Sequence, residues 1–301
     1  MASDDIPFDR ALDARPDWPT RLSPLVRRLI ANNGGPFTFT GTCTYLVGAR
    51  DVTVIDPGPA DPQHQAAILS AVAPGHVARI LVTHSHKDHA PGAATLQAAT
   101  GAPVLGCAPY GRRSAFGAVS TDASHDAAYR PDTALADGDA VEGSDHRLVA
   151  LATPGHTANH LAFALDGEAG LFSGDHVMAW STTVVAPPDG SMRDYMASLD
   201  KLQARADAVY WPGHGGPVTN PARFVRALAI HRRQRENAIL ARIQGGDGNV
   251  AAIVAAIYAG LPPALKGAAG LSVLAHLIDL AERDLVVIEG EPGPAATFRP
   301  R

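Results

Sequence analysis

Short apolar runs separated by turn-forming residues recur along the first two thirds of the chain, and they predict β-strands. Helical spacing between the runs predicts helices over 61–72, 89–101 and 192–205, the first with Asp61 as N-cap and Pro62 at its first position. Strands and helices that alternate in this way indicate an α/β domain. The strand-like runs are "FTFTGTCTYLVG", "DVTVIDPGP", "RILVTH", "APVLGC", "HRLVALATPGH", "HLAFALDG", "GLFSGD" and "DAVYWPGH".

The pattern changes at three places and so suggests domain boundaries. Residues 1–36 are rich in Pro, Arg and Asp, and we expect an irregular lead-in to an α/β domain over 37–219. Residues 108–140 are polar and predict a loop. Residues 220–301 predict a small helical domain of winged-helix type, with helices over 222–243, 249–258 and 271–284 and a strand over 285–290.

The composition narrows the class of protein. With 301 residues, 46% hydrophobic and 18% charged, the chain can bury a sizeable core. A net charge of -5 gives no overall basic field for nucleic acid. No uncharged apolar run reaches the roughly 18 residues of a membrane helix, and no signal-peptide pattern opens the chain. The two cysteines, Cys43 and Cys107, form no CxxC motif, so we expect a cytoplasmic protein with no membrane partner.

Histidines and aspartates follow the strand-like runs at four places: "ILVTHSHKDH", "LVALATPGH", "LFSGD" and "VYWPGH". Turns of this kind lie at one edge of a sheet, where ligands usually bind, so the side chains are expected to converge. Five imidazoles and two carboxylates suit two divalent metal ions, zinc above all. The seven candidate ligands are His84, His86, Asp88, His89, His156, Asp175 and His214.

An isolated histidine is more often a surface or hydrogen-bonded residue than a ligand. We interpret His64, His76, His125 and His231 in that way. The seven candidates differ from them because they share one pattern in four segments. Glycines beside the candidates, Gly155, Gly174 and Gly213, let the backbone turn where side chains crowd.

These motifs resemble those of the metallo-β-lactamase superfamily. "HSHKDH" matches its HxHxDH signature, "TPGHT", "FSGD" and "YWPGHG" follow in the expected order, and "TYLVGARDVTVIDPGP" resembles its first hairpin. The resemblance implies an αββα sandwich with two zinc ions at one edge, Fe or Mn being possible substitutes. It assigns His84, His86 and His156 to one metal and Asp88, His89 and His214 to the other, with Asp175 as the bridge. Asp56 would orient the metal ligands without binding a metal itself, or would simply cap a turn.

The resemblance also implies a mechanism. Two zinc ions lower the pKa of a shared water towards about 7, and the bridging hydroxide would attack an ester, thioester, lactone or phosphodiester. Asp88 would accept the proton as well as bind metal, and is the expected catalytic residue. True zinc β-lactamases lack the bridging aspartate, so β-lactamase activity ranks below the other options. The redox di-iron branch typically has Glu at the position of His86 and a flavin domain, and is disfavoured.

The last third of the chain resembles the lactamase-beta-like endoribonuclease branch, whose animal member cleaves single-stranded RNA. The resemblance rests on "LSVLAHLIDLAERDLVVIEGE" and on "GDHVMAWSTTVVAPPDGSMRDYMASLDKL". The second stretch supplies candidates for the substrate cleft: His176, Trp180, Thr182 and Tyr195. We expect the tail to act as a lid or docking module over that cleft.

Three functions remain open: a hydrolase of small acyl substrates, a single-strand-specific endoribonuclease, and a non-enzymatic zinc-binding winged-helix protein. Arginines along 222–243 could contact phosphates, face solvent or anchor the helix to the acidic core. The segment 271–284 is acidic, and no sequence-specific DNA binding is expected. A basic open groove would favour RNA, whereas a narrow apolar pocket would favour an acyl group. Substrate, native metal and oligomeric state stay undetermined.

Overall fold

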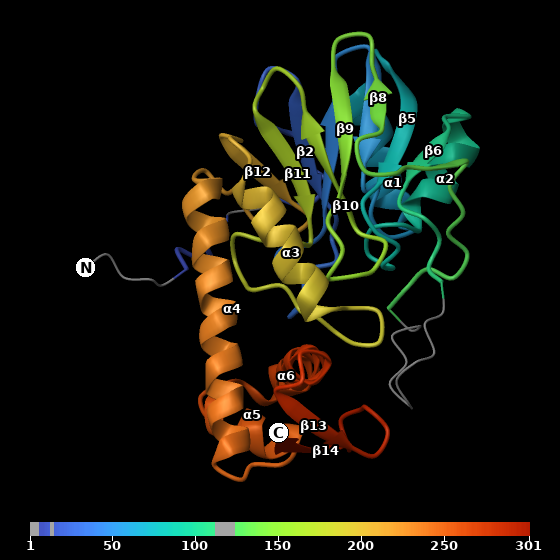
Figure 1. Ribbon diagram of the computed structural model, residues 1–301. Coiled ribbons are helices and arrows are strands. Elements are labelled where there is room, and N and C mark those ends of the chain that lie inside the picture. The colour runs from blue at the N-terminus through green and yellow to red at the C-terminus, as the bar shows by residue number, and fades with distance from the viewer. Residues whose placement is uncertain (1–5, 13–14, 112–123) are drawn as a thin grey trace.

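Two β-sheets face each other and carry helices on their outer sides in the computed structural model, which describes residues 6–12, 15–111 and 124–301 (Figure 1). The larger sheet has the order β1-β2-β3-β4-β5-β6-β7 and the smaller β12-β11-β10-β9-β8. The larger sheet contains β1 (Thr20–Arg21), β2 (Val26–Ile30), β3 (Cys43–Val47), β4 (Asp51–Ile55), β5 (His76–Val82), β6 (Val104–Gly106) and β7 (Thr133–Ala134). The smaller contains β8 (Ala140–Glu142), β9 (Arg147–Ala152), β10 (Leu161–Leu165), β11 (Gly170–Gly174) and β12 (Val209–Pro212). This is the expected αββα sandwich.

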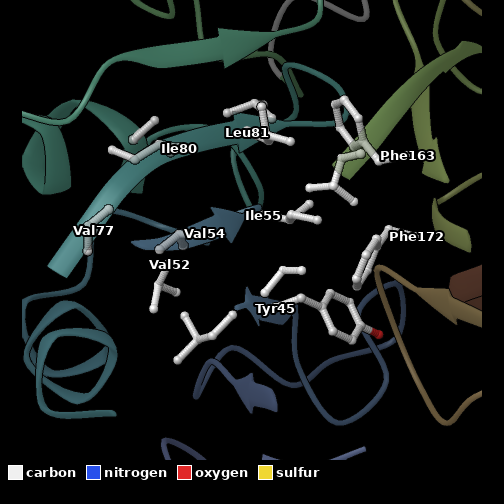
Figure 2. Packing of buried hydrophobic residues seen from close by; sticks show 14 of the residues in the cluster. Tyr45, Val52, Val54, Ile55, Val77, Ile80, Leu81, Phe163 and Phe172 are labelled. Atoms are coloured by element: carbon white, nitrogen blue, oxygen red, sulfur yellow. The ribbon is translucent and has the colours of Figure 1, made fainter. Parts of the chain in front are cut away.

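Apolar side chains from both sheets fill the space between them. Figure 2 shows Phe163 and Phe172 pointing towards Tyr45, Ile55 and Leu81 of the larger sheet, and all five are almost fully buried. The rings of Tyr45 and Phe172 lie 5.1 Å apart between centroids. The strands that carry the candidate ligands are therefore held by a continuous core.

Helices cover the outer faces. α1 (Pro62–Val72) and α2 (Gly92–Thr100) pack on the larger sheet, while α3 (Met192–Gln203) and the first half of α4 (Pro221–Gln244) pack on the smaller. The side chain of Asp61 caps α1 by accepting a hydrogen bond from the Gln63 N–H at 2.9 Å, as the sequence predicts.

The C-terminal domain shares α4 with the sandwich. It adds α5 (Val250–Ile257), α6 (Pro263–Glu282) and a hairpin of β13 (Val286–Glu289) and β14 (Thr297–Pro300). Phe224 and Leu228 of α4 belong to the core beneath the smaller sheet, whereas Ile239 and Ile243 belong to the core of the C-terminal domain. Figure 1 shows α4 running from beside α3 down to α5.

Four expectations about the elements are wrong. Residues 1–36 are not wholly irregular, since β2 pairs with β3; the polar Arg27 and Arg28 interrupt its apolar run, yet Arg28 is buried. α6 begins eight residues before the predicted position, because Pro262 and Pro263 open it and its glycines do not break it. The C-terminal domain ends in two strands, not one. Within 108–140, β7 interrupts the predicted loop, and 112–123 lie outside the described residues.

One helix of the described residues is long and apolar enough, by length and composition, to cross a membrane. This helix is α6. Val273, Leu274 and Leu277 of α6 are buried in the C-terminal core, and the core helix of a soluble protein satisfies the same test. The finding is therefore weak evidence for a membrane span.

Candidate metal centre

The seven candidate ligands converge at one edge of the sandwich, each in the turn after a strand. They come from the ends of β5, β9, β11 and β12. The first group contains His84, His86 and His156: His84 Nε2 lies 3.0 Å from His86 Nδ1, and His156 Nε2 lies 3.1 Å from the same atom. Three imidazole nitrogens are thus directed at one point.

The second group contains Asp88, His89 and His214. His214 Nε2 lies 3.1 Å from Asp88 Oδ2 and 3.3 Å from His89 Nε2, and His89 Nε2 lies 3.4 Å from Asp88 Oδ2. The side chain of Asp88 keeps 28% of its surface exposed, whereas the two rings are buried. Asp88 is consequently the ligand candidate in this group that faces outwards.

Asp175 lies between the two groups. Its Oδ2 is 3.7 Å from His156 Nε2 and 3.4 Å from His214 Nε2, and its Oδ1 is 3.6 Å from His89 Nε2. One carboxylate therefore reaches both groups, as the resemblance implies for a bridging ligand.

Two glycines make room for this arrangement. A Cβ on Gly213 would lie 2.4 Å from Asp175 Oδ1 and 2.7 Å from His89 Cε1. Gly155 has φ +138°, and a Cβ there would lie 2.4 Å from the Tyr195 Cα. Any side chain at either position would displace a ligand or the helix behind it.

Hydrogen bonds from the surrounding chain orient the rings. Asp56, whose φ of +49° lies in the left-handed region, accepts from His89 Nδ1 at 2.9 Å and from the N–H and hydroxyl of Thr83 at 2.8 Å. The Val184 carbonyl accepts from His156 Nδ1 at 2.7 Å, and the Gly41 carbonyl from His214 Nδ1 at 3.2 Å. In each case Nε2 is left free to face the centre.

Burial and charge set the protonation of the cluster. Burial, and then the neighbouring His89 and His86 rings, hold the pKa of His84 well below 6.5, so this ring is neutral. Burial would raise the pKa of Asp175, but His214 and His89 hold it well below 3.8, so this carboxylate is ionised. Burial would lower the pKa of His214, but Asp175 and Asp88 raise it to about 10, so a cation bound in the second group would displace a proton from this ring. Neutral imidazole and ionised carboxylate are the forms that bind metal.

The donor set fits two divalent cations. Within each group, nitrogen and oxygen atoms lie 3.0–3.4 Å apart. Ligand atoms around a tetrahedral zinc with bonds of about 2.0–2.1 Å are about 3.3 Å apart. The buried Asp175 Oδ1 has no hydrogen-bond partner. An ionised oxygen in that position is costly unless a cation balances it.

A pocket of about 580 Å³ opens on the ligand cluster. Its wall includes His86, Asp88, His156, Asp175 and His214. Among the described residues that line it, Lys87 is the only lysine or arginine. Apolar side chains supply much of the remaining wall: Phe37, Pro59, Met178, Val184, Ala268 and Leu271. The last two, Ala268 and Leu271, come from α6.

The four residues predicted for the substrate cleft do not line this pocket. Tyr195 and His176 are fully buried on the far side of the ligand-bearing turns, where the Tyr195 hydroxyl donates to the His176 carbonyl at 3.1 Å. Trp180 stacks on Phe39 with ring centroids 5.0 Å apart, and Thr182 is half-buried outside the wall. Nearness in sequence to Asp175 was misleading, because neighbours of one residue in the chain differ in direction: Met178 and Val184 reach the pocket wall, whereas His176 is buried in the interior.

Sequence reasoning missed His125 as a pocket residue. Its ring lies 1% exposed beside His86, with centroids 4.6 Å apart. Its Nδ1 is 2.9 Å from Ser85 Oγ, and its Nε2 is 3.3 Å from Asp189 Oδ2 without hydrogen-bond alignment. A lone histidine in a polar loop carries no periodic signal, so only the fold places it here.

The arginines of α4 do not form a continuous stripe towards the pocket. Arg232 is buried, Arg242 pairs with Asp247, and Arg235 lies over the Tyr258 ring at 5.1 Å. Arg233 reaches Asp200 at 3.9 Å. These arginines of α4 therefore mainly make contacts within the protein.

An αββα sandwich with a histidine- and aspartate-rich edge and a C-terminal hairpin domain defines a class of metal-dependent hydrolase. The model of the metallo-beta-lactamase superfamily matches residues 37–214, and that of the beta-lactamase associated winged helix domain matches 250–294. The chain belongs to the metallo-beta-lactamase superfamily, and it is a metal-dependent hydrolase.

Known proteins resemble the chain over most of its length. It is 32% identical over 274 residues to a Beta-lactamase-like protein 2 homolog of Drosophila melanogaster, covering 87% of this chain and 89% of the relative. It is 30% identical over 262 residues to an atrochrysone carboxyl ACP thioesterase of Aspergillus fumigatus, covering 80% and 76%. A solved beta-lactamase domain protein from Burkholderia ambifaria has the same fold, with TM-score 0.80, 20% identity, and coverage of 100% and 99%.

Proposed function

We propose that this protein is a dinuclear zinc hydrolase of acyl thioesters or related esters. The observation that carries the proposal is the pocket of about 580 Å³ whose apolar wall faces the ligand cluster. A pocket of this size and lining accommodates a small or medium acyl group. The relative named as an acyl-carrier-protein thioesterase supports the same substrate class.

Two zinc ions held by the seven ligands would acidify a water molecule and polarise the acyl carbonyl. The residues of the chain do the rest. Asp88, the more exposed carboxylate, lies at the pocket wall and accepts the proton of the attacking water. Phe37, Met178 and Leu271 hold the acyl chain and exclude bulk water from the reacting carbonyl.

An RNA substrate is less well supported. A groove that follows a phosphate backbone needs several cationic side chains. Among the described residues of the pocket wall, Lys87 is the only lysine or arginine. The half-buried Phe39 and Trp180 stack on each other, so neither presents both faces to a base.

The test is a turnover panel on zinc-reconstituted protein. It compares acyl thioesters of increasing chain length, the matching oxygen esters, a bis-phosphodiester, nitrocefin and single-stranded RNA. We expect zinc-dependent thioester hydrolysis that improves with chain length until the pocket is filled, and its loss in Asp88→Asn. Cleavage of RNA without thioester turnover would show that the proposal is wrong.

A further inference from the structure

A short segment, Thr183–Val185, lies in contact with two of the candidate metal ligands. The Thr183 hydroxyl donates to the Asp175 carbonyl at 2.7 Å, and the Val184 carbonyl accepts from His156 Nδ1 at 2.7 Å. The position of this segment therefore sets where the His156 ring can lie.

The C-terminal domain holds the same segment from the other side. Arg232 of α4 donates through Nη2 to the Thr183 carbonyl. Ser272 of α6 accepts from the Val185 N–H at 3.4 Å. Thr183 and Val185, on either side of Val184, are thus each bonded to a different helix of the C-terminal domain.

Arg232 is a buried arginine of α4, which is an unusual environment for a cation. It is 3% exposed, and among the described residues no carboxylate pairs with it. Its guanidinium lies over the Tyr195 ring at 5.0 Å, and its Nε has no hydrogen-bond partner. A buried cation without a counter-charge is destabilising. A role in holding the Thr183 carbonyl explains why a cation lies here.

Thr183 bonds the backbone carbonyl of Asp175, whose carboxylate reaches both groups alike, whereas the one imidazole ring that the segment holds, that of His156, belongs to one group only. His156 belongs to the His84–His86–His156 group, and its Nε2 lies 3.1 Å from His86 Nδ1. In the second group, His89 and His214 are oriented by Asp56 and the Gly41 carbonyl, which both belong to the sandwich. A change in the C-terminal domain should therefore affect the two half-sites unequally.

We infer that Arg232 and Ser272 are positioning residues for the His84–His86–His156 half-site. Through Thr183–Val185 they hold the His156 ring so that Nε2 faces the cation, and the C-terminal domain thereby sets the metal affinity of one half-site. The inference rests on the dinuclear centre of the proposed function. It assigns the C-terminal domain a second task besides lining the pocket with Ala268 and Leu271.

The experiment measures zinc affinity by chelator competition in full-length protein, one half-site at a time. A His214→Ala background isolates the half-site of His156, and a His156→Ala background isolates the other. Arg232→Met is introduced into each, with Arg233→Met as the matched control, since Arg233 is the neighbouring exposed arginine of α4.

We expect Arg232→Met to weaken zinc binding at least about tenfold in the His214→Ala background, the size typical of lost outer hydrogen bonds to ligands. In the His156→Ala background, and for Arg233→Met in both, binding should change less than about twofold. Arg232→Lys, which keeps a cation and a donor, should recover part of the loss. Equal losses in both backgrounds, or no loss in either, would overturn the inference.

Ser272→Ala provides a second route if Arg232→Met does not fold, which circular dichroism of the metal-free protein will reveal. It removes a single weak acceptor, and we expect a smaller loss confined to the same half-site. If Ser272→Ala also affects both half-sites alike, the inference is wrong. If the unmodified chain binds no second zinc, the dinuclear centre is wrong, and this inference is wrong with it.

Discussion

Replacing Asp56 by Asn tests the orientation of His89. The carboxylate is 2% exposed and accepts three hydrogen bonds, from the Thr83 N–H and hydroxyl at 2.8 Å and from His89 Nδ1 at 2.9 Å. An asparagine has the same shape, and its carbonyl oxygen can still accept from the Thr83 N–H. Its NH₂ group then occupies the place of Oδ2 and points a donor at His89 Nδ1.

Two donors cannot share that contact, so the His89 proton moves from Nδ1 to Nε2. A protonated Nε2 cannot bind a cation, and the Asp88–His89–His214 half-site should weaken. Losing a partner of this type typically costs about 10–100-fold in metal affinity, which corresponds to about 1.4–2.7 kcal/mol. The fold should tolerate the change, because the volume of the side chain is preserved.

The assay is zinc competition in the His156→Ala background, which retains only the half-site of His89. Asp61→Asn is the matched control: it makes the same substitution at the cap of α1, a position where asparagine caps as well as aspartate. Asp56→Asn protein that binds zinc as tightly as the control would refute the orienting role. Asp56 would then be only a turn cap.

Three further outcomes are expected. Asp175→Asn should lower kcat about 10²–10³-fold because an amide cannot bridge two cations as an anion, and a variant that keeps both metals and full activity contradicts this. Leu271→Glu should lower kcat/KM at least about tenfold for long acyl thioesters but hardly for acetyl esters, with Leu285→Glu, at an exposed position just before β13, as control. Burial, and then Arg232, lower the pKa of His276 to about 3, so the unfolded chain binds the extra proton and stability falls as the pH drops below 6.5. His276→Leu should therefore lose less stability than the parent between pH 6.5 and pH 4 in urea unfolding, and parallel losses would refute this reasoning.

The metal-binding edge is predictable from sequence because each of its turns follows an apolar strand. Such strands end at a common edge once they pair, and the HxHxDH spacing adds a specific signature. The pocket wall is different. Ala268 and Leu271 are ordinary helix residues, and only the packing of α6 under the sandwich brings them to the ligands. No local pattern carries that information.

Errors in the prediction have similar physical causes. β2 carries Arg27 and Arg28 in the middle of its run, and the sequence alone does not reveal that Arg28 is buried and donates to the Gly215 carbonyl at 3.4 Å. His176 and Tyr195 were placed in the cleft because they stand close to Asp175 in sequence or in a related motif. His176 directly follows β11 and Tyr195 belongs to α3, and in the fold both side chains are buried in the interior.

The path of α4 through two cores has a mechanical consequence. Phe224 and Leu228 anchor one end of the helix in the sandwich, while Ile239 and Ile243 anchor the other among α5, α6 and the hairpin. A single unbroken helix fixed at both ends behaves as a stiff beam, so the C-terminal domain cannot swing about a flexible joint as a hinged lid would. Any change in the width of the pocket must then come from local shifts, either of Ala268 and Leu271 in α6 or of wall residues on the sandwich side such as the exposed Phe37.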